Sequence, residues 1–113
     1  MADTRVFELR TYQALPGRLD ALQARFRDHT MGLFARHGIE VVVFCRPTDG
    51  ERARDTLTYL LAFPDRAAAE ASWTKFRADP EWIAAKAASE ADGDIVDHMD
   101  STFLAPTDYS PLS

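Results

Sequence analysis

Hydrophobic and polar residues alternate near the beginning of the chain, from Arg5 to Tyr12. In an extended backbone every second side chain shares a face, so one face would carry Val6, Glu8, Arg10 and Tyr12. The opposite face would carry Phe7, Leu9 and Thr11. This period of two predicts a β-strand, and the pair Pro16-Gly17 then separates it from the next element.

Helical spacing replaces the alternation over residues 16–36. The apolar positions that set this spacing are Leu19, Leu22, Phe26 and Leu33. We therefore predict one helix here, with Pro16 in its first turn, where its missing N–H costs nothing. Gly38 follows the last turn, at a position that favours the left-handed backbone conformation.

The middle of the chain predicts a β-hairpin. Ile39–Phe44 is a continuous β-branched and aromatic run, which is typical of a strand buried on both faces. Residues 47–55 are mostly polar and charged and predict a turn. The run Thr56–Phe63 then returns beside the first strand of the hairpin.

Two capped helices and a strand are predicted for the rest of the chain. Asp65 precedes a helix over 66–78, and the pair Asp79-Pro80 begins a second helix that ends near Ala91. Residues 94–104 alternate again and predict a last strand, followed by an extended tail over 105–113.

The predicted order is β-α-β-β-α-β, which indicates a ferredoxin-like α+β fold. We expect a single domain over residues 1–113, with a core at about 5–104 and the last strand paired to the first. The two central strands carry large apolar residues on both faces, while two helices cover only one face. A homodimer joined through the open sheet faces would remove that apolar surface from water.

Composition limits the classes of partner and cofactor. The 113 residues include 18 acidic and 13 basic side chains, giving a net charge of −5, so we expect no nucleic-acid partner. We find neither a secretory signal nor an apolar run long enough to span a membrane, and expect a cytoplasmic protein. Phosphate loops and metal-ligand clusters are absent from the sequence, so we predict no metal, nucleotide or flavin.

Glu8, Arg10 and Tyr12 share one strand face and could line a single cavity. Arg10 would then clamp a carboxylate, and Tyr12 would donate a proton or a hydrogen bond. The alternative is a cross-strand ion pair and a packed tyrosine. Tyr59, Trp73 and Trp82 complete the predicted ligand-binding set, because large aromatic side chains around a cavity bind flat ligands. Core packing is the other interpretation of these aromatics.

The histidines are the candidate acid–base groups. At helical spacing His29 and His37 both point toward the apolar face of the first helix, so His29 could serve as a general base in a pocket. The alternatives are an edge-of-core residue for His29 and an interaction with the last helical carbonyls for His37. His98 shares a strand face with Asp100, either as a catalytic pair or as an ordinary polar surface.

The only cysteine, Cys45, rules out an internal disulfide and any multi-cysteine metal site. It follows an apolar run and precedes Arg46, whose charge could lower the thiol pKa. A small apolar core residue is the favoured interpretation, which predicts slow reaction with a thiol reagent in the native protein.

Several short motifs along the chain form a recognisable set: Phe7-Glu8-Leu9-Arg10-Thr11-Tyr12, Pro16-Gly17, His37-Gly38-Ile39, Tyr59-Leu60-Leu61-Ala62-Phe63, Trp73 to Phe76 and Asp79-Pro80-Glu81-Trp82. Together they resemble the NIPSNAP family, whose members adopt the dimeric α+β barrel. The resemblance implies the architecture over nearly the whole chain and leaves the activity unassigned. Small bacterial members often carry an aromatic residue where this chain has Cys45.

We therefore predict a NIPSNAP-family protein that binds or transforms a small apolar or aromatic metabolite between sheet and helices. If it is an enzyme, we expect cofactor-independent acid–base or oxygenase-like chemistry, with Tyr12, His29 and His98 as catalytic candidates. Cofactor-free oxygenases and haem-degrading enzymes of this barrel commonly use an asparagine, and this chain contains none. The alternative function is a non-catalytic module for oligomerisation or partner docking.

Overall fold

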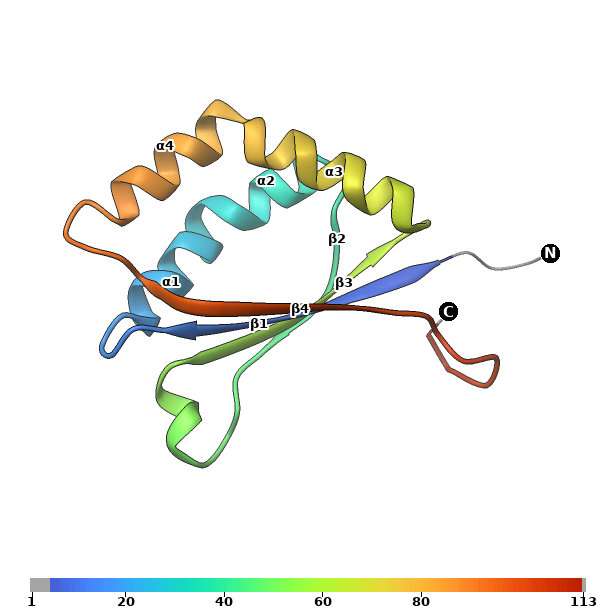
Figure 1. Cartoon of the computed structure of the whole chain (residues 1–113), viewed down its shortest axis with the longest axis horizontal. Coiled ribbons are helices and arrows are strands. Elements are labelled where there is room, and N and C mark those ends of the chain that lie inside the picture. The colour runs from blue at the N-terminus through green and yellow to red at the C-terminus, as the bar shows by residue number, and fades with distance from the viewer. Residues whose placement is uncertain (1–4, 113) are drawn as a thin grey trace.

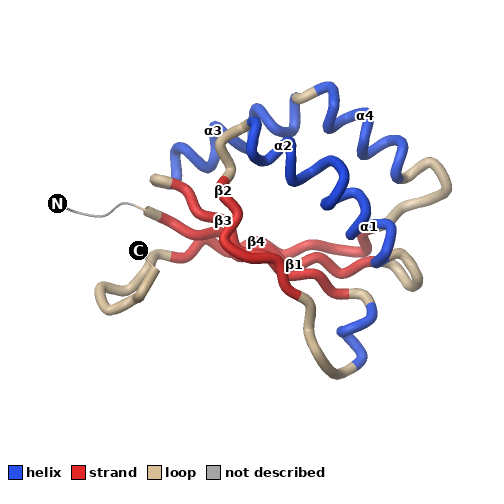
Figure 2. The backbone as a smooth tube through the Cα atoms, turned by 180° about the vertical axis from the view of Figure 1, so that it is seen from behind, coloured by secondary structure: helices blue, strands red, loops and turns tan. Residues whose placement is uncertain are grey.

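A four-stranded antiparallel sheet forms one layer of the protein, and the main helices form a second layer on one of its faces (Figures 1 and 2). The computed structural model describes residues 5–112. The strands are β1 (Val6–Ala14), β2 (Glu40–Cys45), β3 (Thr56–Phe63) and β4 (Val96–Leu104). The helices are α1 (Leu19–Arg25), a π-helical segment η1 (Phe26–Thr30), α2 (Met31–Arg36), a 3-10 turn η2 (Glu51–Arg54), α3 (Arg66–Ala78) and α4 (Pro80–Ser89).

The strands lie in the order β2-β3-β1-β4, which confirms the predicted ferredoxin-like α+β fold. β1 occupies the centre, paired with β3 on one side and with β4 on the other. Because cross-strand partners share a face, the register fixes which side chains meet. Arg10 lies opposite Tyr59 on β3 and opposite Ser101 on β4.

The first helical stretch departs from the prediction in two ways. Pro16 and Gly17 form a turn before the helix, with φ +77° at Gly17, so α1 begins only at Leu19. After Arg25 the backbone widens into the π-helical segment η1 before α2 continues. A π-helical turn contains more residues than an α-helical turn, so a spacing of 3.6 residues loses its phase there.

The other predicted boundaries hold closely. The Asp65 carboxylate accepts a hydrogen bond from the Ala68 N–H at 2.7 Å at the start of α3. Asp79 accepts one from the Glu81 N–H at 2.9 Å, with Pro80 as the first residue of α4. Gly38 has φ +72°, which confirms the left-handed residue after α2.

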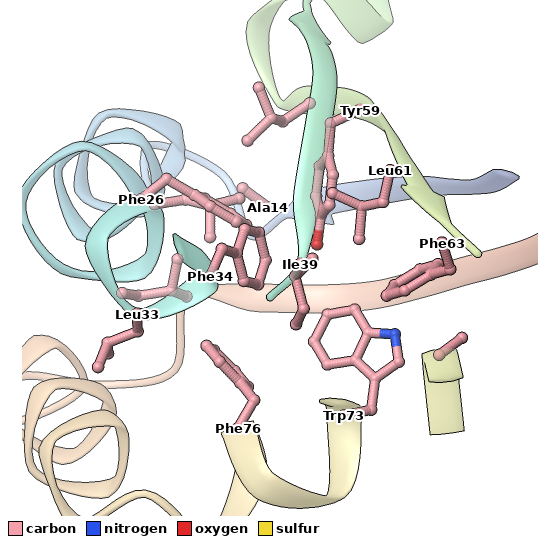
Figure 3. Packing of buried hydrophobic residues seen from close by; sticks show 14 of the residues in the cluster. Ala14, Phe26, Leu33, Phe34, Ile39, Tyr59, Leu61, Phe63, Trp73 and Phe76 are labelled. Atoms are coloured by element: carbon pink, nitrogen blue, oxygen red, sulfur yellow. The ribbon is translucent and has the colours of Figure 1, made fainter. Parts of the chain in front are cut away.

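The core lies between the helices and one sheet face, which we call the inner face. Leu57, Tyr59, Leu61 and Phe63 are all at most 4% exposed, as their alternation in β3 predicted. Rings from three helical segments meet them there (Figure 3). Phe34 contacts Trp73 edge-on, with ring centroids 5.6 Å apart, and packs on Phe76 at 5.2 Å. These aromatic contacts join the helix layer to the sheet.

The opposite sheet face, the outer face, has no helix over it (Figure 1). Leu9, Val43 and Leu104 are 37%, 45% and 40% exposed there. Cys45 at the end of β2 is also exposed, so the prediction of a core cysteine is wrong. A bulge between Val41 and Val43 changes the alternation along β2 and leaves Cys45 opposite Thr58 on the outer face.

Candidate functional site

A buried carboxylate organises the inner face of β1. Glu8 is only 2% exposed, and both of its oxygens accept hydrogen bonds. Its Oε1 accepts from Trp73 Nε1 at 2.7 Å, and its Oε2 accepts from Ser101 Oγ at 2.5 Å. Arg10 Nη1 donates to the same Oε2 at 2.8 Å and supplies the opposite charge. A charge this deeply buried is tolerated because it is paired and fully hydrogen-bonded.

The Arg10 guanidinium links this carboxylate to two phenols. Its Nε donates to Tyr59 Oη at 2.8 Å, and its Nη2 donates to Tyr12 Oη at 2.9 Å. The hydroxyl of Tyr59 also donates to that of Tyr12 at 3.3 Å. The guanidinium lies 4.3 Å from the centroid of the Trp73 ring, a cation–π distance. Arg10, Tyr12 and Tyr59 form one connected group, which we call the polar floor.

The network fixes the charge state of the polar floor. Burial raises the pKa of the Tyr59 hydroxyl well above its ordinary value, and the neighbouring Tyr12 raises it further against the opposing effect of Arg10. Burial alone would lower the pKa of Arg10, but Tyr12, Tyr59 and Glu8 outweigh burial and raise that pKa. Near neutral pH, Tyr59 is a neutral phenol and Arg10 is a cation.

A cavity of about 200 Å³ opens above the polar floor, between the sheet and the helices. Its lining includes the polar floor, and its walls are five aromatic side chains: Phe26, Phe34, Trp73, Phe76 and Trp82. Thr30, Arg25, Arg77 and Lys86 complete the lining. An apolar cavity of about 150 Å³ holds one benzene molecule, so this cavity matches a single substituted ring.

The π-helical segment contributes two of these lining residues. Phe26 and Thr30 stand at its two ends, and both line the cavity. The Thr30 hydroxyl donates to the Arg25 carbonyl at 3.3 Å, so it is held by the widened turn. Single π-helical turns occur frequently at functional sites, which agrees with this position. Phe26 also lines a more open hollow of about 230 Å³ beside Phe44, which lacks the polar floor.

Three cationic side chains, Arg25, Arg77 and Lys86, form part of the lining away from the polar floor, and we call them the cationic rim. Arg25 is buried and lies 5.3 Å from the Trp82 ring centroid, while Arg77 and Lys86 are exposed. Glu90 pairs with Arg25 at 3.3 Å and with Lys86 at 3.1 Å. Burial would raise the pKa of Glu90, but these two cations outweigh it and lower that pKa.

The structure brings together five of the predicted site residues: Arg10, Tyr12, Tyr59, Trp73 and Trp82 line one cavity. Glu8 is absent from the lining, since its carboxylate is held behind Arg10 and Trp73. It therefore positions the two side chains that a ligand would contact. Glu8 and Arg10 do form an ion pair, but it lies within β1, so the cross-strand pair that we gave as the alternative is wrong in its geometry.

The two histidines proposed as catalytic lie elsewhere. His29 is exposed, so the expectation that it points into the apolar face is wrong. The π-helical segment turns it away, because the spacing of 3.6 residues does not hold there. His98 lies on the outer face of β4, half-exposed, with its Nε2 3.4 Å from Asp100 Oδ2. Neither imidazole lines the cavity.

His37 has a partner that the sequence did not indicate. Its Nε2 lies 2.7 Å from Asp79 Oδ2, so the imidazole bridges the end of α2 to the start of α4, while the backbone N–H of His37 donates to the Leu33 and Phe34 carbonyls. The hydrogen bond from His37 lowers the pKa of Asp79, as does the one from the Glu81 N–H. Within residues 5–112 no group of three or more histidine, cysteine, aspartate or glutamate side chains is arranged to hold a metal ion.

Sequence reasoning missed Ser101, Phe26, Thr30 and the cationic rim. The signal for Ser101 was available, because the expected pairing of the first and last strands places it beside Arg10 on the inner face. The rim had no such signal, since Arg25 comes from α1 whereas Arg77 and Lys86 come from α3 and α4. Only the packing of these helices brings the three together.

Comparison with known proteins finds a matching family model and several similar solved structures. The family model described as NIPSNAP matches residues 7–111. A solved NIPSNAP family protein from Agrobacterium tumefaciens, with unknown function, superposes with a TM-score of 0.84 at 19% identity, covering 100% of this chain and 97% of that one. No curated protein matches.

Two further solved structures share the fold. An uncharacterized NIPSNAP-like domain protein from Burkholderia xenovorans superposes with a TM-score of 0.83 at 15% identity, covering 97% of this chain and 91% of that one. SnoaB, a cofactor-independent oxygenase from Streptomyces nogalater, superposes with a TM-score of 0.62 at 15% identity, covering 97% and 99%. Among the described residues no helix is long and apolar enough to cross a membrane.

Proposed function

This chain belongs to the NIPSNAP family, and we propose that it binds a small single-ring metabolite in the cavity between its sheet and its helices. The observation that carries the proposal is the cavity lining: aromatic walls on several sides and a preformed set of hydrogen-bonding groups at one end. Ligand sites commonly combine mostly apolar walls with a few fixed polar groups.

The polar floor would bind a neutral oxygen substituent of the ring, such as a hydroxyl or carbonyl. Arg10 uses three of its five N–H groups in the hydrogen bonds to Glu8, Tyr12 and Tyr59. The Tyr12 hydroxyl accepts from Arg10 and can donate its own proton to a ligand oxygen. Since all these groups are held before binding, little ordering would be required of them.

The same groups limit which chemistry we propose. Donors aimed at one ligand oxygen stabilise negative charge that develops there, which is a common element of catalysis without a cofactor. SnoaB, which shares the fold, is a cofactor-independent oxygenase. The described lining of this cavity contains no imidazole or carboxylate to act as general base. We therefore propose ligand binding as the function, with Tyr12 as the hydrogen-bond donor.

Tryptophan signals provide a direct test. The chain has two tryptophans, and both line the cavity, so their indole N–H signals in an NMR spectrum report on binding here. Trp82 also lines a neighbouring hollow, so the Trp73 signal identifies this site. We expect phenol to shift both signals saturably and to bind several-fold more tightly than toluene. Tyr12→Phe should remove that preference, whereas Tyr109→Phe, at an 83% exposed position, should not. Indole signals unmoved by either compound would refute the proposal.

We further propose that the chain forms a homodimer through its outer faces. The support is the exposed apolar surface of Leu9, Val43 and Leu104 on neighbouring strands of that face. A second copy would bury this surface symmetrically, since a two-fold interface places the same patch on both subunits. This assembly also serves the alternative function of an oligomerisation module, and the binding experiment above separates the two.

A further inference from the structure

The two ends of the cavity differ in net charge. At the polar floor the charge of Arg10 is already matched, because the Glu8 carboxylate lies 2.8 Å from its Nη1. Tyr12 and Tyr59 add hydroxyl groups, and the raised pKa of Tyr59 keeps that phenol neutral. The floor is therefore suited to a neutral polar group. A ligand carboxylate there would have to share Arg10 with Glu8.

The cationic rim carries excess positive charge. It has three cations, and within the described residues one carboxylate, Glu90, is paired with two of them. Arg77 makes no hydrogen bond or ion pair with any described residue, and it lines the cavity. An anion at the rim would therefore meet an uncompensated guanidinium.

Arg25 gives a second, independent indication that the cationic rim binds a ligand. Its side chain is 4% exposed, and its Nη1 donates to Ser89 Oγ at 3.2 Å and to Glu90 Oε2 at 3.3 Å. Its Nε–H is buried and has no hydrogen-bond partner within residues 5–112. Buried N–H groups without a partner are rare in folded proteins, and a ligand oxygen in the cavity would satisfy this one.

We propose that the cationic rim binds the anionic group of the cavity's ligand, which makes the ligand class a ring carboxylate with a neutral oxygen at its far end. The ring lies between the aromatic walls, the carboxylate contacts Arg77 and Lys86, and the neutral oxygen bonds Tyr12. This inference rests on the proposed function and assigns the carboxylate to the cationic rim, as an alternative to the predicted clamp by Arg10. The volume of about 200 Å³ leaves room for one ring with two small substituents.

A matched pair of compounds tests the inference. 4-Hydroxybenzoate and 4-hydroxybenzamide have nearly the same shape and differ in charge. From the shifts of the two indole signals we expect the acid to bind wild-type protein at least tenfold more tightly. The double substitution Arg77→Gln with Lys86→Gln removes two of the three rim cations and leaves Arg25, so it should reduce that preference at least threefold and leave the affinity for the amide within twofold. Both side chains are exposed, so the fold tolerates their replacement.

The control removes the same charge from exposed positions outside this lining: Arg27→Gln with Lys75→Gln should keep the preference for the acid. Equal affinities of the wild type for acid and amide would overturn the rim assignment and leave the proposed cavity function standing. A preference for the acid that the rim substitutions leave undiminished would also overturn it. Failure of both compounds to bind would overturn the rim assignment and count against the proposed function as well.

Discussion

Two pairs of basic and acidic side chains, each two residues apart along a strand, lie in opposite surroundings on the two faces of the sheet. On the inner face Glu8 and Arg10, two residues apart in β1, are 3% and 12% exposed at their side chains. On the outer face His98 and Asp100, two residues apart in β4, are 54% and 77% exposed. The pattern of alternation in the sequence is the same for both pairs. Only the layer that covers the face distinguishes them.

The same comparison applies to apolar residues. Leu61 and Phe63 of β3 are buried beneath the helices, whereas Leu9 and Val43 are exposed on the outer face. The helix layer covers one face only (Figure 2). Polar side chains therefore mark the proposed ligand cavity on the covered face, and apolar side chains mark the proposed subunit interface on the open face. Residue type alone would suggest the reverse.

The largest predicted effect lies in the buried pair. Arg10→Met leaves the Glu8 carboxylate without its charged partner and should lower the free energy of unfolding by about 3–5 kcal/mol. Urea denaturation of the protein without ligand measures this loss. A role for Arg10 in ligand binding alone would leave the stability of the unliganded protein almost unchanged, so this loss separates the two roles.

A double substitution identifies why Arg10→Met lowers the free energy of unfolding. If the loss comes from an unpaired charge, Glu8→Gln combined with Arg10→Met should be less destabilising than the sum of the two single substitutions. Additive losses would mean that packing on Trp73, and not charge pairing, holds Arg10 in place. The Glu8–Arg10 and His98–Asp100 pairs would then differ less in their contribution to the free energy of unfolding than their burial indicates.

The second-largest predicted effect is on the dimer dissociation constant and concerns the outer face. Leu9 lies at its centre, paired with Leu60 and Thr102. Leu9→Lys places a charge in the proposed interface of both subunits and should raise the dimer dissociation constant at least a hundredfold, or about 2.8 kcal/mol. Sedimentation equilibrium over a range of concentrations gives the constant.

A matched substitution on the helix layer is the control. Ile83 in α4 is 56% exposed, and Ile83→Lys should leave the dimer constant unchanged. A wild-type protein that sediments as a monomer of 12.7 kDa at micromolar concentration would contradict the dimer. The open apolar face would then need another explanation.

The sequence predicted the fold well because its signals were local. The alternation in β1 placed Glu8, Arg10 and Tyr12 on one face, and Asp65 and Asp79 marked the helix starts through their own backbone contacts. The site was harder to predict because it depends on phase and packing. The π-helical segment after Arg25 changed the direction of His29, and no local pattern indicates such a turn.

The smallest predicted effect concerns the exposed His98–Asp100 pair and completes its comparison with the buried Glu8–Arg10 pair. His98→Gln removes one partner of the exposed pair, whose atoms lie 3.4 Å apart in high-dielectric surroundings. In the Leu9→Lys background, where the outer face is open to water, we expect the free energy of unfolding to change by less than about 0.5 kcal/mol. Chemical denaturation measures it, with Thr102→Gln on the same face as the control. A loss as large as that of Arg10→Met would contradict the conclusion that burial, rather than spacing along the strand, determines what an ion pair contributes. If the protein forms the proposed dimer, the same substitution in the wild-type background then shows whether the second subunit covers His98, since desolvating the pair would increase its effect.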